Sequence, residues 1–346
     1  MMDFDIVLNM ARLDDETPMQ QVWDKTNYMV RLADEAGFTT AWTAEHHTIE
    51  LTIAPNPFQL LSHWAAITKN IRLGTGIVTA PYWHPIRLAG EAGLCDLISG
   101  GRLEFGIGRG SFQYEFDRMQ PGIDQREGVG YMKEMLAALK ELWKGDYAHD
   151  GQYWQFPTAT ACPKPQQLPH PPLWCAARDP GSFDWAISNG CNIMATPLQA
   201  PHSEVEVLVN RFNDTVARYP ELPRPKLMML RRVCVYDNPD DWMVPVEGVT
   251  NFGRYFETLM KNIGGVENGF ADPADYQAIA NKNDYDPKSL HENMLFGTPE
   301  EVVVKLKKYE ALGIDTFLYG EAYGVSDEFN KRSLELFASE VMPHFQ

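Results

Sequence analysis

Short apolar segments alternate with amphipathic helical patterns along the whole chain, and this alternation restricts the fold more than any other feature. Eight segments are short and rich in apolar or β-branched residues, which is typical of strands. They cover residues 3–9, 39–43, 71–79, 103–107, 173–176, 191–195, 226–236 and 315–319. Helical patterns follow them at 18–37, 58–69, 85–98, 125–144, 179–189, 204–218, 299–312 and 327–342. Eight strands that alternate with helices favour an α/β fold with a closed parallel sheet, the (β/α)8 or TIM barrel.

The length predicts one barrel with insertions. Such a barrel typically needs about 250 residues, and this chain has 346. Residues 145–171 are rich in aromatic residues and prolines, which indicates an extended surface segment or a hairpin. Residues 237–297 show no clear period and read as a long insertion. We therefore expect a single domain over residues 1–346 with insertions at about 145–171 and 237–297.

Charge and cysteine usage restrict the partners and the compartment. Lys and Arg total 30 against 47 Asp and Glu, a formal net charge of −17, so the surface repels nucleic acid and anionic membranes. The five cysteines are widely spaced and form no Cys-x-x-Cys pair, which favours reduced thiols over disulfides or structural zinc. No signal segment or long apolar stretch is present. We expect a cytoplasmic protein with neither a nucleic-acid nor a membrane partner.

The fourth predicted strand runs into a glycine-rich loop that carries one arginine. Glycines 108 and 110 allow backbone N–H groups to approach an anion, and the Arg109 guanidinium can donate two hydrogen bonds to a phosphate or carboxylate. A tight turn alone would also explain the glycines, and Gly-x-Gly-x-Gly by itself does not decide between the two interpretations.

In a (β/α)8 barrel the loops that follow the strands share one face. Polar residues that are scattered in the sequence are therefore expected to converge there. They are Glu45, His46, His47, Thr75, Gly76, Arg109, Ser111, Asp179 and Ser182.

Several blocks of sequence together resemble the bacterial luciferase-like flavin monooxygenase family. In order they are 43–47 (Thr-Ala-Glu-His-His), 55–57 (Pro-Asn-Pro), 68–76 (Thr-Lys-Asn-Ile-Arg-Leu-Gly-Thr-Gly), 84–87 (His-Pro-Ile-Arg) and 101–110 (Gly-Arg-Leu-Glu-Phe-Gly-Ile-Gly-Arg-Gly). Residues 173–186 resemble the fifth strand of the family and the helix start after it. The resemblance implies a barrel that uses reduced FMN, supplied by a separate flavin reductase, and O2 to oxygenate a small organic substrate through a flavin peroxide.

The resemblance also implies which residues hold the cofactor. Arg109, the backbone at Ser111, Arg126 and the helix start at Asp179 and Ser182 would bind the FMN phosphate. Helix N-terminal N–H groups and two guanidiniums suit a phosphate dianion on physical grounds as well.

Two further segments would lie beside the flavin ring. Relatives place a non-proline cis peptide beneath the ring at the position of Thr75-Gly76-Ile77. Gly108 replaces the cysteine of the light-emitting luciferases, which argues against light emission and predicts extra room beside the ring.

The resemblance assigns His46 as the catalytic base or proton donor, a role suited to an imidazole that titrates near neutrality. A histidine held by a carboxylate for structural reasons is the alternative. We assign His47 and His84 to structure and expect a homodimer, although Gly90 replaces the acidic residue that accompanies these histidines in relatives. Tyr319 and Glu321 follow the last strand and are expected to face the pocket.

Other activities on the same barrel stay open. One is hydride transfer with a deazaflavin, another is metal-dependent hydrolysis with Glu45, His46 and His47 as ligands, and a third is flavin binding without catalysis. Adjacent histidines on one loop are poor joint ligands, so we expect no metal site. Residues 237–297 contain several aromatic side chains, which favour an apolar organic substrate, namely Trp242, Phe252, Tyr255 and Phe256.

Overall fold

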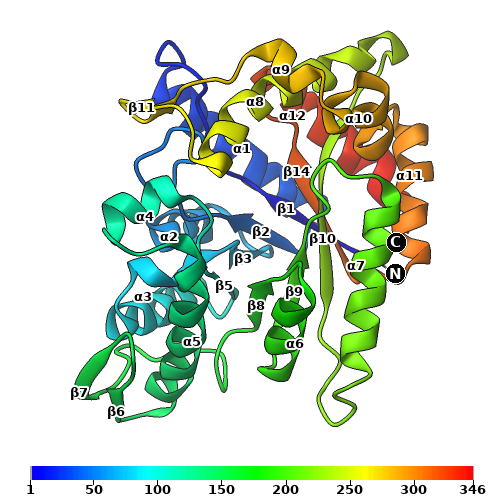
Figure 1. Ribbon diagram of the computed structural model, residues 1–346. Coiled ribbons are helices and arrows are strands. Elements are labelled where there is room, and N and C mark those ends of the chain that lie inside the picture. The colour runs from blue at the N-terminus through cyan, green and yellow to red at the C-terminus, as the bar shows by residue number, and fades with distance from the viewer. Residues whose placement is uncertain (1, 346) are drawn as a thin grey trace.

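Eight parallel strands close into a barrel in the computed structural model, which describes residues 2–345 (Figure 1). The barrel strands are β1 (Asp3–Val7), β2 (Thr40–Thr43), β3 (Arg72–Thr75), β5 (Leu103–Gly108), β8 (Leu173–Ala176), β9 (Asn192–Ala195), β10 (Leu227–Val235) and β14 (Thr316–Glu321). Neighbours pair in this order, and β14 pairs with both β10 and β1, which closes the sheet. The predicted (β/α)8 barrel is therefore confirmed.

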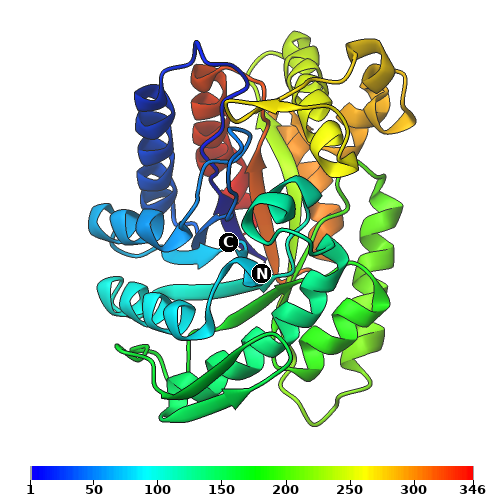
Figure 2. The same cartoon turned by 60° about the vertical axis from the view of Figure 1, so that its left-hand side comes forward.

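Helices surround the strands, as Figure 2 shows. They are α1 (Met19–Ala36), α2 (Pro57–Ile67), α3 (Pro85–Ile98), α4 (Gln113–Met119), α5 (Gly128–Lys144), α6 (Pro180–Ser188), α7 (His202–Val216), α11 (Pro299–Ala311) and α12 (Asp327–Leu336). Prolines occupy the first position of α2, α3, α6 and α11, where a missing N–H costs nothing. Gly37 ends α1 with φ of 85°, a left-handed conformation that glycine adopts without strain. Apolar faces of these helices pack on the outer surface of the barrel.

The barrel interior is layered. Trp42 and Trp174 meet edge to face with ring centroids 5.3 Å apart. The indole N–H of Trp42 donates to Asp5 at 2.8 Å, and that of Trp174 donates to Glu104 at 2.6 Å. Burial raises the pKa of Asp5 to about 8. These groups form a packed floor, so the space for a ligand lies above them, towards the carboxyl ends of the strands.

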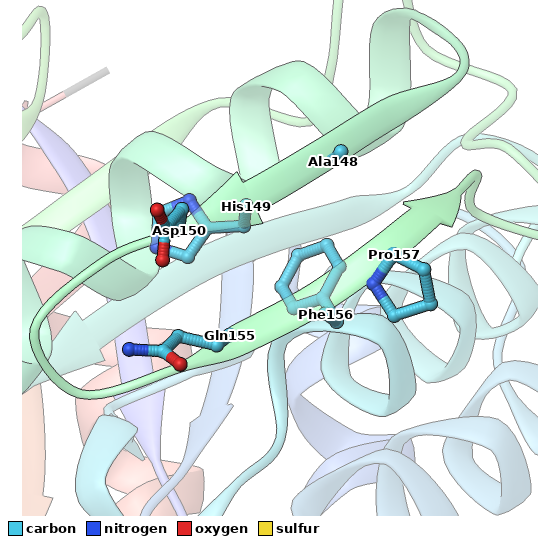
Figure 3. Close-up of a pocket in the computed structure, with 6 residues that line it drawn as sticks. All are labelled: Ala148, His149, Asp150, Gln155, Phe156 and Pro157. Carbon is cyan, nitrogen blue, oxygen red and sulfur yellow. The ribbon is translucent and has the colours of Figure 1, made fainter.

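The segment at 145–171 contains the hairpin β6 (Tyr147–Asp150) and β7 (Gln155–Ala159). A hollow of about 450 Å³ lies on it, lined by Ala148, His149, Asp150, Gln155, Phe156 and Pro157 (Figure 3). The hairpin follows the end of α5 and precedes the start of β8, so it lies at the amino ends of the strands. The hollow is therefore remote from the carboxyl ends, where barrel enzymes place their active sites.

Residues 237–297 are more regular than their sequence indicated. They contain α8 (Met243–Lys261), α9 (Tyr276–Ala280) and α10 (Pro287–Asn293), together with the short strands β11 (Val266–Glu267), β12 (Phe270–Ala271) and β13 (Leu295–Gly297). The expectation of a region without helical period was wrong for α8. Glycines 248 and 253 interrupt its apolar pattern, and an added Cβ at 253 would lie 2.5 Å from the Tyr285 ring. Close packing against Tyr285 therefore explains why α8 contains Gly253, a residue type that disfavours helices in the sequence.

All five cysteines are free thiols, and four of them are buried. Within residues 2–345, no helix combines the length and the apolar character needed to cross a bilayer.

Candidate active site

Segments that follow four different strands meet at the carboxyl end of the barrel. His46 follows β2, and α4 follows β5 and packs against α8. Asn9 follows β1 and Tyr323 follows β14, and the Asn9 amide donates to the Tyr323 hydroxyl at 3.0 Å. Figure 1 shows α8, α9 and α10 above this end of the barrel.

His46 is held by a buried carboxylate. Its Nδ1 lies 3.1 and 3.2 Å from the two carboxylate oxygens of Glu115, and the backbone N–H of His47 donates to the same group at 2.6 Å. Glu115 is only 2% exposed. Because an ionised carboxylate only accepts, we assign the proton of a neutral His46 ring to Nδ1. The lone pair then lies on Nε2, which makes no hydrogen bond within the described chain, so His46 can take a proton from a bound molecule.

His47 belongs to a separate, structural network. Its Nε2 pairs with Glu45 at 2.7 Å, while the other Glu45 oxygen accepts from the Thr79 N–H and the Trp83 indole, each at 2.8 Å. His84 caps α3, where its Nδ1 accepts from the Ile86 N–H. The structural assignment of both histidines fits these contacts. Among residues 2–345, no three His, Cys, Asp or Glu side chains form a group able to hold a metal ion.

The loops proposed to hold phosphate follow adjacent strands, since β5 pairs with β8. Among residues 2–345 the exposed Arg109 guanidinium donates only to the Gln125 carbonyl, at 3.3 Å, and Gly110 has φ of 83°. Asp179 caps α6 by accepting from the Ser182 N–H at 3.0 Å, and the Ser182 hydroxyl donates to the Asp179 carbonyl. Within residues 2–345 Arg109 forms no ion pair closer than 4 Å, and the strand before it neighbours the strand that leads into α6. A guanidinium and a helix start that follow adjacent strands suit a phosphate group.

Arg126 and Arg178 are engaged elsewhere in this structure. Arg126 is 83% exposed, and its guanidinium donates to Asp124 at 2.6 Å. This pairing holds the pKa of Asp124 well below its usual range. Arg178 lies 3.9 Å from Glu204 of α7, and its carbonyl accepts from Arg211. Arg126 would have to leave Asp124 to contact a phosphate, and Arg178 turns towards α7.

The third strand ends in the expected way. A cis peptide joins Gly76 and Ile77, and the Thr75 hydroxyl both donates to and accepts from the backbone of Gly106 at 2.8 Å. The extra room expected beside Gly108 is absent, because an added Cβ there would lie 2.7 Å from Cδ1 of Ile77. The isoleucine fills the space that the glycine leaves.

Tyr319 and Glu321 do not face the pocket as expected. The Tyr319 ring is fully buried outside the barrel against α12, where its hydroxyl bonds to Ser333. The Glu321 carboxylate pairs with Lys25 of α1 at 2.7 Å. Residues 319 and 321 share one side of β14, because side chains alternate along a strand, and that side is the outer one.

An aromatic row lines the site between α4 and α8. We define it as Phe112, Phe256 and Phe252. Phe112 lies 5.0 Å from the His46 ring and 6.2 Å from Phe256, and Phe256 stacks on Phe252 at 6.1 Å. Tyr255 belongs to the same apolar cluster, whereas Trp242 packs against His291 at 5.6 Å in a different one.

Sequence reasoning missed five residues of this site: Asn9, Phe112, Glu115, Tyr323 and Arg232 of β10, whose guanidinium lies 4.1 Å from the centroid of the Tyr323 ring. Glu115 lies on α4, which has only seven residues and too few turns for a readable period. Arg232 has an arginine neighbour at 231, and the sequence does not tell which of the two faces the barrel interior.

Comparisons with known proteins find a matching family and similar solved structures. A family model described as luciferase-like monooxygenase matches residues 2–316. The oxygenase component of a flavin-dependent trigonelline monooxygenase from Acinetobacter baylyi is 42% identical over 344 residues, which cover 99% of this chain and 96% of that protein.

Two solved structures share the fold. One is the oxygenating constituent of 3,6-diketocamphane monooxygenase from Pseudomonas putida in complex with FMN, with a TM-score of 0.78 at 20% identity over 100% of this chain and 99% of that one. The other is an F420-dependent secondary alcohol dehydrogenase, with a TM-score of 0.76 at 18% identity over 100% of this chain and 98% of that one. At these identities the likeness concerns the fold alone.

Proposed function

This chain belongs to the luciferase-like monooxygenase family, and from that premise we propose that it is the oxygenase of a two-component system. It uses reduced FMN and O2 to oxygenate a small organic molecule, and a separate flavin reductase supplies the reduced flavin. The observation that carries the proposal is the His46–Glu115 pair at the mouth of the barrel, beside an aromatic row. Within residues 2–345 the Nε2 atom of this imidazole makes no hydrogen bond. Reduced FMN supplies the two electrons that activate O2, of which one atom enters the substrate and the other leaves as water.

The chain's own residues bind, orient and exclude water. Arg109 and the start of α6 would hold the phosphate of the cofactor, and Thr75 and Gly76 would belong to the segment that contacts its ring. The aromatic row excludes water from the substrate, which protects the reactive cofactor from side reactions. Nε2 of His46 receives or returns the proton, while Glu115 fixes the orientation of the ring.

A deazaflavin oxidoreductase is the alternative, because that cofactor is named for a protein of the same fold. The flavin-dependent relative is far more similar in sequence, so we favour FMN. Anaerobic titration of the protein with reduced FMN and with reduced F420, each followed by absorbance, separates the two. Tighter binding of F420 would reverse the assignment. Binding of reduced FMN with no oxygenation of any tested compound after O2 is admitted would indicate a non-catalytic flavin protein.

The assembly is proposed to be a cytoplasmic homodimer of one-domain subunits. Leu94, Leu97 and Ile98 lie on one face of α3 and are 46%, 52% and 50% exposed. Residues three and four apart on a helix form a continuous patch, and an exposed apolar patch of this kind favours an interface.

Turnover tests the proposal directly. The protein is mixed with NADH, FMN, a flavin reductase and trigonelline, for which the 42% identical relative is named, and the product is examined by mass spectrometry under 18O2. Incorporation of one labelled atom supports the proposal. His46→Ala is expected to abolish it, and His344→Ala, an exposed histidine, serves as the control. Flavin-driven peroxide formation without labelled product for any tested organic compound would contradict it.

A further inference from the structure

Arg232 is a cation inside the mouth of the barrel. Side chains alternate along β10, and Arg231 points outwards, where it donates to the carbonyls of Leu198 and Ala200 and to the Tyr309 hydroxyl. Arg232 therefore faces inwards, above Leu230, which packs on the floor of the barrel. Gly320 of the neighbouring strand makes room for it, since an added Cβ there would lie 3.1 Å from an Arg232 nitrogen.

The Arg232 guanidinium has no counter-ion in the part of the chain that the structure describes. Among residues 2–345 its single hydrogen bond goes to the Glu321 carbonyl at 3.3 Å, and no carboxylate oxygen lies within 4 Å of it. The Glu321 carboxylate itself is turned away and pairs with Lys25. A guanidinium has five N–H donors, and a half-buried cation with unused donors is costly unless an anion joins it.

Two aromatic rings lie beside this guanidinium. It lies 4.1 Å from the centroid of the Tyr323 ring and 6.0 Å from that of Phe252. The Tyr323 hydroxyl is held in turn by Asn9 at 3.0 Å. Contact with the π faces of these rings uses none of the Arg232 N–H donors in hydrogen bonds to oxygen. Those donors remain able to bind the two oxygens of a carboxylate.

The aromatic row joins this cation to the proposed base. Phe252 is the ring beside Arg232, and Phe112 at the other end of the row is the ring beside His46. One apolar wall therefore has an anion-binding group at one end and a proton-transfer group at the other. A flat ring that carries an acidic substituent is complementary to this arrangement.

We propose that Arg232 binds a carboxylate of the substrate, so that the substrate class is planar aromatic acids whose ring packs on the aromatic row. The inference rests on the proposed function and refines its apolar organic substrate to one with a single anionic group. In a chain of net charge −17, this local cation also offsets the field that would otherwise repel an acid.

The test compares acids with their amides, because the two differ in charge but hardly in shape. The pairs are trigonelline with 1-methylnicotinamide, nicotinate with nicotinamide, and benzoate with benzamide. Each is titrated calorimetrically into the protein with bound reduced FMN under anaerobic conditions. The wild type is expected to bind at least one acid ten-fold or more tighter than its amide.

Three variants locate the effect. Arg232→Met should weaken binding of that acid about 10- to 150-fold and leave the amide within two-fold, because only the acid loses a charge-assisted hydrogen bond. The affinity of Arg232→Lys for the acid should lie between those of the wild type and Arg232→Met, since lysine keeps the positive charge but not the two parallel N–H donors of a guanidinium. Arg118→Gln removes an exposed guanidinium from nearby α4 and should change neither the affinity for the acid nor that for the amide. Circular dichroism of each variant checks that it folds.

The outcomes separate this inference from the proposed function. If no acid exceeds its amide in the wild type, or if Arg232→Met weakens both equally, the inference is wrong. If Arg232→Met instead weakens reduced FMN with acid binding intact, Arg232 serves the cofactor and the inference is likewise overturned. Failure of the wild type to bind reduced FMN at all would refute the proposed function itself.

Discussion

Replacing Glu115 by Gln tests whether this carboxylate controls His46. The variant keeps the size of the side chain, and its amide oxygen can still accept from the His47 N–H. Its amide nitrogen then faces Nδ1 of His46 as a donor, whereas the carboxylate presents two acceptors at 3.1 and 3.2 Å. We expect the His46 proton to move to Nε2, which turns the atom that should accept a proton into one that donates.

The magnitude follows from the contacts that are lost. A hydrogen bond to a charged group is worth about 1.5–3 kcal/mol, and about 1.4 kcal/mol of barrier is a ten-fold change in rate. Because Glu115 is buried at 2% exposure, water does not replace the lost contact. We therefore expect kcat to fall by about 10- to 150-fold while the affinity for reduced FMN changes little.

Single-turnover kinetics provide the assay, with 15N NMR of the imidazole as a direct report on the tautomer. Asp117→Asn removes an exposed carboxylate from the same helix and is the control. A Glu115→Gln protein with wild-type kcat, or one with an unchanged imidazole spectrum, would refute the reasoning.

Three further changes have defined outcomes. The pKa of Asp5 rises from 3.8 to about 8 in the folded protein. The free energy of unfolding of the wild type should therefore fall between pH 4 and pH 8, by up to about 1.4 kcal/mol per pH unit. Denaturant titrations should show a smaller fall for Asp5→Asn, and an equal fall in both proteins would contradict this. Gly108→Ala should crowd Ile77, destabilise the protein by about 1–3 kcal/mol and weaken FMN binding. Thermal melts measure the loss of stability and flavin titration measures the affinity; no change in either would contradict this prediction. Leu97→Glu should yield monomers in light scattering, whereas a persistent dimer would exclude the α3 patch as the interface.

The barrel was predictable because its strands and helices repeat one local pattern. Most strand and helix bounds lie within one or two residues of those expected, and α3 matches at both ends. A helix or strand that buries one face has apolar residues at a regular spacing. This spacing is visible in the sequence even when the elements packed against that face are unknown.

Long-range packing sets the features that were missed. The glycines of α8 conceal its pattern, although Gly248 and Gly253 are needed where the helix meets residue 324 and Tyr285. The outward turn of Tyr319 and Glu321, and the inward turn of Arg232, depend on the register of β14 and β10. The loops that follow strands are recognisable in the sequence and contain His46. Its partner Glu115 lies on α4, and the position of that short helix depends on long-range packing.

The most direct test of the proposed function follows the reaction of the reduced complex with oxygen. The protein is mixed anaerobically with reduced FMN, oxygen is added in a stopped-flow instrument, and flavin absorbance is recorded. We predict a distinct phase that precedes the appearance of oxidised flavin and that becomes short-lived in His46→Ala. Immediate oxidation at the rate of free reduced FMN would contradict the monooxygenase assignment and the role of His46.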